Sequence, residues 1–586
     1  MGGAVSDRGR RLSENRRLFL RNRARIEASP DSENFHTVVG MNRHRFVFYF
    51  LSVTLLCLSG RGEEGVKIRG KIVDSDSPGD AVHARLYIES EEAKNFVAIS
   101  EGGIAIPYEI TRGGSVEVHT SLSAHPFSVV LPPGKYTFTA EKGKEFIPVQ
   151  REVTVSAGAP EVVLSLQRWI DMSEGGWFSG ETHVHRTIDD LKTLMLCEDL
   201  NVALPLTAWV SKLEDTPFLN NRNTDPVPPG QLIKIDDTHV IWPRNTEYEI
   251  TSVNGQRHVL GALFVLNHQK KLRLPAMPVR AVAEEARRQG AILDLDKQNW
   301  PWSMMLIPQT KVNLFELTNN HIWRTEFMFK SWFPEYVADY MNIEKDETGL
   351  TENGWIDFGF QNYYALLNCG FNIKPSGGTA SGVHPVPLGY GRVYVQLEGE
   401  FNYDAWMEGL EKGRSFVTTG PMLEVTVGGK GPGERISLVE SGTGVVKVRG
   451  KVSSPVSQAL TKIEIVVNGK VVESIPVASK ETRPGGLISR EEITTEVSVK
   501  ESSWIVVRAF ADRGNGRRSF AHSSPVYVDV PGKPLRPRKE EVEFLLKRVR
   551  DEITRHEGVL SEEEVKEFRE AAEFYEGLLT LPTSRR

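Results

Sequence analysis

Short alternations of apolar and polar residues fill the first hundred positions after residue 64. A period of two is clearest in Tyr136-Thr137-Phe138-Thr139-Ala140, and it returns in Val153-Thr154-Val155 and in residues 162–166. Alternation of this kind predicts strands that bury one face, and turn-forming runs at 74–80 and 131–135 separate them. Residues 64–168 therefore predict a small β-sandwich, similar to transthyretin-like and carboxypeptidase-regulatory-like modules.

The pattern changes at about residue 169. Residues 279–289 have helical spacing and end at Gly290, where a residue after a helix commonly takes positive φ. The apolar run 291–295 that follows is short enough to be a buried strand. Alternation of helices with buried strands over residues 169–428 predicts an α/β layer or barrel.

Strand patterns return in residues 429–531. Residues 463–472 read as a hairpin whose Asn468-Gly469 pair suits a type I′ turn. Residues 429–531 thus predict a second β-sandwich. After a Pro-rich hinge, residues 532–586 carry two amphipathic stripes, and Ser561 with Glu564 predicts a capping box, so the tail is expected to be a helical hairpin.

The N-terminal region carries a short apolar run at residues 46–59, directly after Arg43-His44-Arg45. A basic segment, a short apolar segment and small residues at its end are typical of a secretory signal, whereas a spanning helix needs about 20 apolar residues. An uncleaved anchor is the alternative. We expect translation to start at Met41, residues 1–62 to be an extension plus signal peptide, and the protein to be exported to the periplasm or the extracellular medium without a stable membrane span after cleavage.

Composition narrows the classes of function. A chain of 586 residues is too long for one domain, and a net charge of −6 gives no case for binding nucleic acid. Only Cys197 and Cys369 follow the signal segment, so a disulfide-dense scaffold or a cysteine zinc site is excluded. Any metal site must use histidines and carboxylates.

The strongest chemical signal is the pair His183 and His185 within Gly180-Glu181-Thr182-His183-Val184-His185-Arg186. On a strand, residues two apart face the same side, so both imidazoles can reach one ion at about 2.0–2.1 Å. Glu249 and His258 are plausible further ligands. The alternative for these two is a solvated strand face and a hydrogen-bonded residue at a strand end.

Polar residues also stand where later strands end. Asp294, Asp296 and Lys297 follow the strand at 291–295, and His384 lies in the later run 375–385. Such positions are where α/β folds build sites, so Asp296 and His384 are candidates for the general base. Trp300, Trp302 and Trp323 either line a pocket or belong to the core.

The order of these segments resembles the PHP (polymerase and histidinol phosphatase) superfamily, and within it the exported CehA/McbA-like metallohydrolase branch, over roughly residues 170–530. The resemblance rests on segments 181–186, 249–258, 312–319, 413–421 and 522–528. It implies a distorted (β/α)7 barrel with metal ions at the carboxyl ends of the strands.

Several positions depart from that family. Leu206-Thr207-Ala208-Trp209 stands where the family has Thr-Asp-His, residues 294–302 stand where it has His-Pro, and Gly378-Thr379-Ala380-Ser381-Gly382 stands where it has Gly-Thr-Asp-x-His. These replacements remove metal ligands, so a three-metal cluster is not expected.

The sequence thus favours an exported metal-dependent hydrolase with a reduced site that binds a divalent ion (zinc, manganese or iron) and acts on an ester, amide or phosphoester in a small-molecule or carbohydrate substrate. The alternative is a non-catalytic PHP-like pseudoenzyme that binds carbohydrate or a cell surface. A structural surface protein without a small ligand is the third hypothesis.

Overall fold

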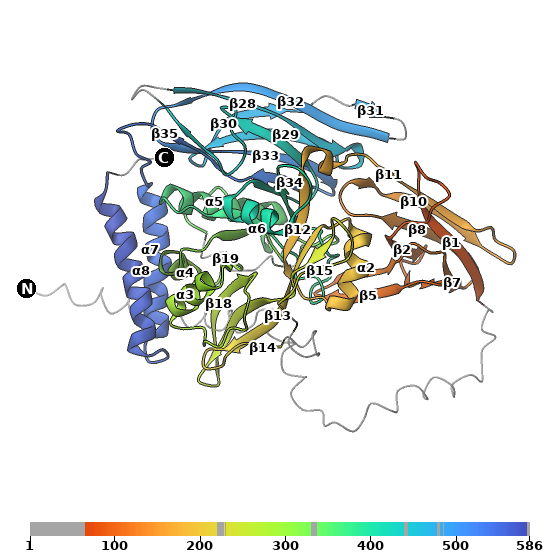
Figure 1. Cartoon of the computed structure of the whole chain (residues 1–586), viewed down its shortest axis with the longest axis horizontal. Helices are drawn as coiled ribbons and strands as arrows, with labels where there is room; N and C mark the ends of the chain where they lie inside the picture. The colour runs from red at the N-terminus through yellow and green to blue at the C-terminus, as the bar shows by residue number, and fades with distance from the viewer. Residues whose placement is uncertain are drawn as a thin grey trace, which may run out of the picture. The chain divides into compact units, whose positions relative to one another are not determined.

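Several sheets and seven helices make up the described part of the chain, as expected for a strand-rich, multidomain protein (Figure 1). The computed structural model describes residues 65–219, 228, 230–327, 329, 337–438, 444–477, 481–483 and 486–582. The predicted extension and signal peptide, residues 1–62 with Met41, lie outside the described residues. No helix of the described ranges is long and apolar enough to cross a membrane.

Two sheets form the N-terminal part. One has the order β4 (Ile99–Ser100), β7 (Phe127–Leu131), β1 (Val66–Asp74), β11 (Val162–Arg168) and β9 (Phe146–Ile147). The other has the order β10 (Val149–Val155), β8 (Gly134–Glu141), β2 (Ala84–Ser90), β6 (Ser115–Leu122) and β5 (Ala105–Arg112), with β3 (Asn95–Phe96) on β2. In β8 the alternating residues Tyr136, Phe138 and Ala140 are buried, which confirms the predicted period of two.

Mixed strand pairing characterises the α/β part. Parallel pairs join β12 (Trp177–Val184), β13 (Val202–Lys212) and β17 (Asn245–Val253), and others join β19 (Ile292–Leu295), β20 (Leu314–Thr318) and β23 (Lys374–Gly377). Between the two groups, β18 (Gln256–Leu266) runs antiparallel to β17 and β19. β24 (Arg392–Gln396) pairs antiparallel with β12, and β25 (Ser415–Thr418) with β24.

Five helices accompany these strands: α2 (Ile188–Glu198), α3 (Val279–Arg288), α4 (Ser303–Thr310), α5 (Glu352–Asn368) and α6 (Tyr403–Lys412). The helix predicted over 279–289 is confirmed, and Gly290 has φ 68°. Short elements complete the region: η2 (Met172–Gly175), β14 (Phe218–Leu219), β15 (Ile233–Lys234), β16 (Val240–Ile241), β21 (Lys345–Asp346) and β22 (Gly349–Leu350).

The third part contains two groups of strands. One continues from β25 through β34 (Arg517–Ser523) to β33 (Ser503–Gly514), β29 (Leu460–Val467), β30 (Lys470–Pro476), β35 (Val526–Asp529) and β27 (Arg435–Ser437). The other has the order β26 (Met422–Val427), β28 (Gly444–Pro455), β32 (Gly486–Val499) and β31 (Glu481–Arg483), and η4 (Val456–Gln458) follows β28. Between β29 and β30, Asn468 and Gly469 have φ of 48° and 81°, as the predicted type I′ turn requires.

The tail forms two packed helices, α7 (Lys539–His556) and α8 (Glu562–Thr580), and the capping box of Ser561 and Glu564 is present. They lie beside α3 and α4 (Figure 1). Glu567 of α8 accepts hydrogen bonds from the backbone N–H groups of Val279 (2.8 Å) and Arg280 (3.1 Å). Because Pro278 gives α3 no side-chain cap, the tail satisfies the first turn of a helix nearly 300 residues earlier.

Candidate metal centre

Strand β12 brings two imidazoles together at its carboxyl end. His183 and His185 are 1 % and 7 % exposed, and their Nε2 atoms lie 3.3 Å apart. Backbone bonds fix this end of the strand, since the Ala380 N–H donates to the His183 carbonyl (2.8 Å) and the His185 N–H to the Ser381 carbonyl (3.0 Å). The loop of residues 380 and 381 therefore holds the histidine pair in place.

Glu247 of β17 completes a group of three ligand atoms. Its Oε2 lies 3.4 Å from His185 Nε2, and the ligand atoms of His183, His185 and Glu247 all lie within 4.8 Å of one another. Two ligands bound at 2.0–2.1 Å to a tetrahedral ion are about 3.3–3.4 Å apart. The separations of 3.3 Å between the two Nε2 atoms and 3.4 Å between His185 and Glu247 match that edge length, so these three residues fit a metal ion.

A second group shares His183 and adds Asp296 and Glu316. His183 Nδ1 lies 3.0 Å from Glu316 Oε1 and 3.9 Å from Asp296 Oδ1. A metal-binding histidine commonly donates its second N–H to a carboxylate, which fixes the tautomer. His183 therefore fits best with its proton on Nδ1, facing Glu316, and with its Nε2 lone pair facing His185 and Glu247.

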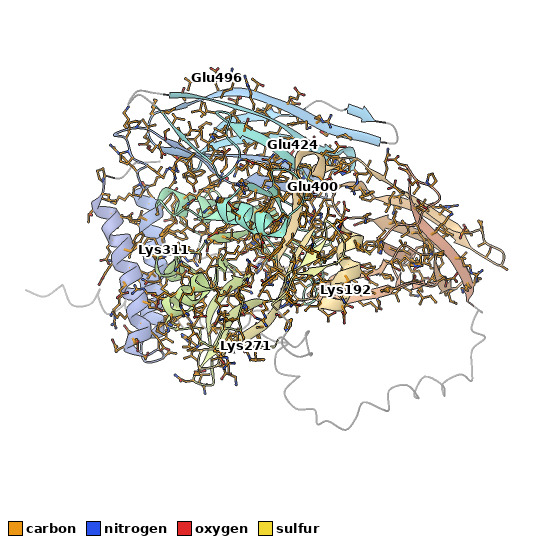
Figure 2. The ribbon with its side chains drawn as sticks, in the orientation of Figure 1. Lys192, Lys271, Lys311, Glu400, Glu424 and Glu496 are labelled. Carbon is orange, nitrogen blue, oxygen red and sulfur yellow. The ribbon has the colours of Figure 1, made fainter. Side chains whose placement is uncertain are left out.

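Lys297 lies between the carboxylates of the centre. Lys192 and Lys311, which are labelled in Figure 2, are exposed, whereas Lys297 is buried. Its Nζ lies 2.5 Å from Asp296 Oδ2, 3.0 Å from Glu249 Oε1 and 3.5 Å from Glu247 Oε1. The backbone of Lys297 takes a left-handed conformation (φ 50°), a strained state for a side chain of this size that occurs often at functional sites.

Burial is the first cause of the pKa shifts of the histidine and carboxylates in these two groups. It lowers the pKa of His183 to about 3, so the ring is neutral, as a metal ligand must be. Burial and then the charge of Glu249 raise the pKa of Glu247, and burial and then Asp296 raise that of Glu316. Burial opposes ionisation of Asp296 too, but Lys297 and His183 bring its pKa below the ordinary value. Carboxylates outnumber cations here, and a bound cation would balance them.

Two of the predicted ligands lie elsewhere. Glu249 is outside both groups, because one of its oxygens pairs with Lys297 and the other accepts from Trp209 Nε1 at 3.3 Å. His258 lies near the opposite end of β18 from Phe264, whose ring contacts His183. His258 and Phe264 are six residues apart along the strand, which corresponds to roughly 20 Å. His258 Nε2 instead lies 2.9 Å from His556 Nδ1 of α7.

The two predicted general bases have different surroundings. Asp296 lies in the second group, as described. His384 has both nitrogens engaged: Nδ1 accepts from Arg112 Nη1 at 3.1 Å, and Nε2 lies 3.2 Å from Asn320 Nδ2. Burial and then the charge of Arg112 lower the pKa of His384 well below its ordinary value. The His384 carbonyl accepts from the Tyr108 hydroxyl, so strand β5 of the N-terminal part holds this loop.

Three residues that sequence reasoning did not assign prove central: Glu247, Glu316 and Lys297. Glu247 and Glu249 are two apart on one strand, and alternation alone cannot choose between them. Which glutamate faces His185 depends on Lys297, which follows β19 and forms an ion pair with Glu249. Trp300, Trp302 and Trp323 are all buried, which agrees with the core alternative.

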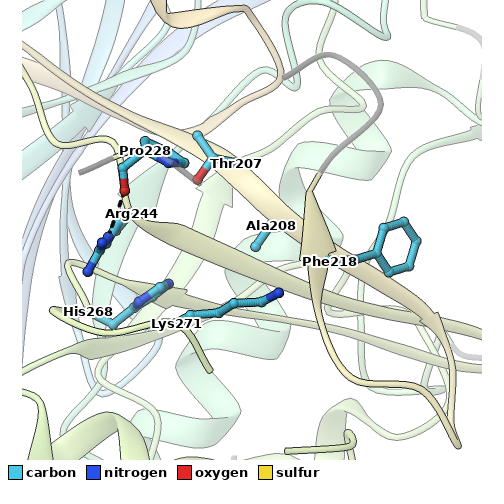
Figure 3. A pocket seen from close by; sticks show the side chains of 7 residues that line it. All are labelled: Thr207, Ala208, Phe218, Pro228, Arg244, His268 and Lys271. Carbon is cyan, nitrogen blue, oxygen red and sulfur yellow. Dashed lines mark hydrogen bonds between the residues drawn. The ribbon is translucent and has the colours of Figure 1, made fainter. Parts of the chain in front are cut away.

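A small cavity of about 20 Å³ adjoins Thr207 and Ala208 of β13 (Figure 3). Arg244, His268 and Lys271 contribute to its wall, and the Pro228 carbonyl accepts from Arg244 Nε at 2.9 Å. This volume suits a single water rather than a substrate.

No protein-family model matches the chain, and no curated protein matches its sequence. Among solved structures, the chain is similar to a two-domain protein from Bacteroides vulgatus that contains a predicted PHP-like metal-dependent phosphoesterase. The two share 9 % identity with a TM-score of 0.25, and the match covers 57 % of this chain and 90 % of the other.

Proposed function

We propose that this protein is a metal-dependent hydrolase whose divalent ion is held by His183, His185 and Glu247. The observation that carries the proposal is the spacing of their ligand atoms, 3.3 Å and 3.4 Å, combined with the Glu316 contact that turns His183 Nε2 toward them. Two imidazoles and one carboxylate are a ligand set that zinc, manganese and iron all accept. The substrate would be an ester, amide or phosphoester in a small molecule or carbohydrate.

When bound, a divalent ion supplies Lewis acidity and makes water a better nucleophile at neutral pH. The chain's own residues divide the remaining tasks. Glu316 orients His183, and Lys297 keeps Asp296 ionised. Because Lys297 engages both oxygens of Asp296 and the pKa of this carboxyl is below its ordinary value, we assign Asp296 to the electrostatics of the site rather than to proton transfer. We assign His384 to the wall of the site rather than to proton transfer, because Arg112 and Asn320 engage both of its nitrogens.

The test compares the metal content of the purified protein with that of a His183→Ala plus His185→Ala double variant. We expect about one divalent ion per chain in the parent protein and little in the double variant, together with loss of hydrolysis across a panel of model esters, amides and phosphoesters. His258→Ala is the matched control and should keep its metal. Metal content that the double substitution leaves unchanged would sink the proposal.

We also propose that the α/β part is a PHP-like barrel of the CehA/McbA type and that a β-sandwich flanks it on each side in the sequence. This proposal rests on the sequence motifs. One contact supports barrel closure, because Val184 at the end of β12 forms a parallel bridge with Ser381, just after β23. An experimental structure in which these strands do not form a closed ring would contradict the assignment.

Export is a separate proposal that rests on residues 43–59. N-terminal sequencing of the protein from its native source should give a first residue close to position 60. A first residue at Met1 or Met41 in the mature protein would contradict cleavage.

A non-catalytic binding protein is the second candidate, and Lys297 favours it. Its ammonium group already supplies positive charge to Asp296, Glu249 and Glu247, so part of the buried negative charge is balanced by the chain itself. If this candidate is correct, the purified protein should contain no bound metal and should hydrolyse none of the model substrates. Its binding to a glycan array should persist after the double histidine substitution.

A further inference from the structure

A larger cavity, of about 210 Å³, lies where segments from all three sheet-bearing parts of the chain meet. We call it the junction cavity. It is lined by residues of the N-terminal part around Lys144, by Tyr390 and Arg392 at the start of β24, and by Gln458 of η4 and Arg513 of β33. Five cationic side chains and two acidic ones reach it: Arg85, Lys144, Arg324, Arg392, Arg513, Glu141 and Glu198.

Three of these cations already have carboxylate partners. Arg85 pairs with both Glu141 and Glu198, Arg324 with Glu117 at 2.9 Å, and Arg513 with Glu352 at 3.1 Å. Their charges are largely neutralised, because each pair is wholly or mostly buried.

Lys144 and Arg392 differ from these three. Neither has a carboxylate within ion-pair distance in the part of the chain that the structure describes. Lys144 Nζ donates to the Thr419 carbonyl (2.9 Å) and lies 4.0 Å from the centre of the Tyr390 ring. The Arg392 guanidinium donates to backbone carbonyls, at 2.6 Å from Gly389 O and at 2.9 and 3.1 Å from the carbonyls at the end of α2.

The lining therefore has more cationic than acidic side chains, and two of the cations, Lys144 and Arg392, have no carboxylate within ion-pair distance among the described residues. Burial and then the charges of Arg392 and Arg513 lower the pKa of Lys144, and the charge of Glu141 opposes them. An anion between Lys144 and Arg392 would balance their charges. Arginine and lysine donors around a polar cavity match the geometry of phosphate and sulfate oxygens, and the volume exceeds that needed for one water.

We propose that the junction cavity is a binding site for a tetrahedral oxyanion, phosphate or sulfate, either free or as the terminal group of a small molecule, held by Lys144 and Arg392. The site is separate from the metal centre and does not depend on hydrolysis by this protein. Gly389 connects the two regions, since its carbonyl accepts from Arg392 and its N–H donates to Glu181, two residues before His183.

The experiment measures anion binding to the full chain by calorimetry and by the shift in melting temperature. The probes are inorganic phosphate, sulfate and a simple phosphate monoester, with acetate at the same ionic strength as reference. Lys144→Met is the test variant, and Lys142→Met, which changes the same residue type two positions earlier and outside the cavity, is its matched control. Metal content is measured in each protein, so that a failure of the metal centre is recognised separately.

We expect phosphate or sulfate, but not acetate, to raise the melting temperature of the parent protein and of Lys142→Met. Lys144→Met should bind about 10- to 100-fold more weakly, because it loses one charge-assisted bond. Without the anion, Lys144→Met should melt at or above the temperature of the parent protein, since it removes a charge that has no carboxylate within ion-pair distance among the described residues. Stronger binding of the monoester identifies a terminal group as the ligand, and stronger binding of the inorganic ion identifies a free ion. Equal anion effects in the parent protein and in Lys144→Met, or no effect in either, would overturn the proposal.

Discussion

The position of one lysine decides which glutamate faces the histidine pair. Glu247 and Glu249 leave β17 on the same side, and Lys297 Nζ lies 3.0 Å from Glu249 but 3.5 Å from Glu247. Glu249 is therefore committed to an ion pair, and Glu247 keeps one oxygen toward His185.

Isosteric substitutions separate the two roles. Glu247→Gln should lower metal affinity by about tenfold or more, because it removes the anionic ligand, whereas Glu249→Gln should leave metal content close to that of the parent protein. Metal content of dialysed proteins, measured by atomic emission, distinguishes them. Equal loss in both variants would mean that the carboxylates act as one charged group without individual ligand roles.

Gly378 is a second residue on which the centre depends. A Cβ atom at this position would collide with the Cβ of His183 and with Glu316 Oε1. Gly378→Ala should therefore displace His183 and reduce metal content, with a folded protein by circular dichroism. Gly399→Ala is the exposed comparison, although its positive φ (88°) adds a small backbone strain of its own. Full metal occupancy in Gly378→Ala would show that His183 is not fixed by this contact.

At this scale, the sequence predicts part of the centre. Strand periodicity places the side chains of residues 183 and 185 on one face, and in the structure their Nε2 atoms lie 3.3 Å apart. Glu247 lies on β17, Glu316 on β20 and Lys297 just after β19, so their convergence depends on which strands become neighbours. His258 shows the same limit, because its distance from the pair follows from its place along β18 and from the docking of α7.

The sequence predicts individual helices, turns and caps better than it predicts the contacts between them. Helix α3, its terminating Gly290, the Asn468-Gly469 turn and the capping box of α8 all follow from local signals. What local signals do not contain is the support that α3 receives from α8 through Glu567.

Glu567→Ala tests that support. The substitution leaves two backbone N–H groups at the start of α3 without their acceptor, and should lower the free energy of unfolding by about 1–2 kcal/mol. Glu573→Ala, an exposed change on the same helix, should alter it by less than about 0.5 kcal/mol. Urea denaturation of both variants makes the comparison, and equal stability would mean that water replaces the carboxylate at this helix end.

For the whole molecule, stability should depend on pH through buried histidines that bind the α/β part to the C-terminal strands. His522 of β34 donates from Nδ1 to the Ser523 carbonyl (2.8 Å), and its Nε2 accepts from the Tyr364 hydroxyl of α5 (2.8 Å). Burial and then the charge of Arg508 lower its pKa to about 3.

The direction of the effect follows from that pKa. Below about pH 6.5 the unfolded chain binds a proton at His522 that the folded chain does not, so stability falls as pH falls from 6.5 toward 3. Between pH 7 and pH 5 this residue should account for about 2 kcal/mol of lost stability. Denaturation of the parent protein and of His522→Gln at both values checks this, and the variant should lose less. An identical pH dependence in the two proteins would assign the acid sensitivity to other groups.

The contacts of strand β5 bear on how such a protein can be divided. Tyr108 and Arg112 hold the loop that carries His384, and Arg85 of β2 neutralises Glu198 at the end of α2. A shortened protein that begins at residue 169 would expose Glu198 without its cation and release one wall of the metal centre. The N-terminal sheets therefore contribute to the metal centre. Sheets from another protein could replace them only if they placed a phenol and two guanidinium groups at the positions of Tyr108, Arg112 and Arg85.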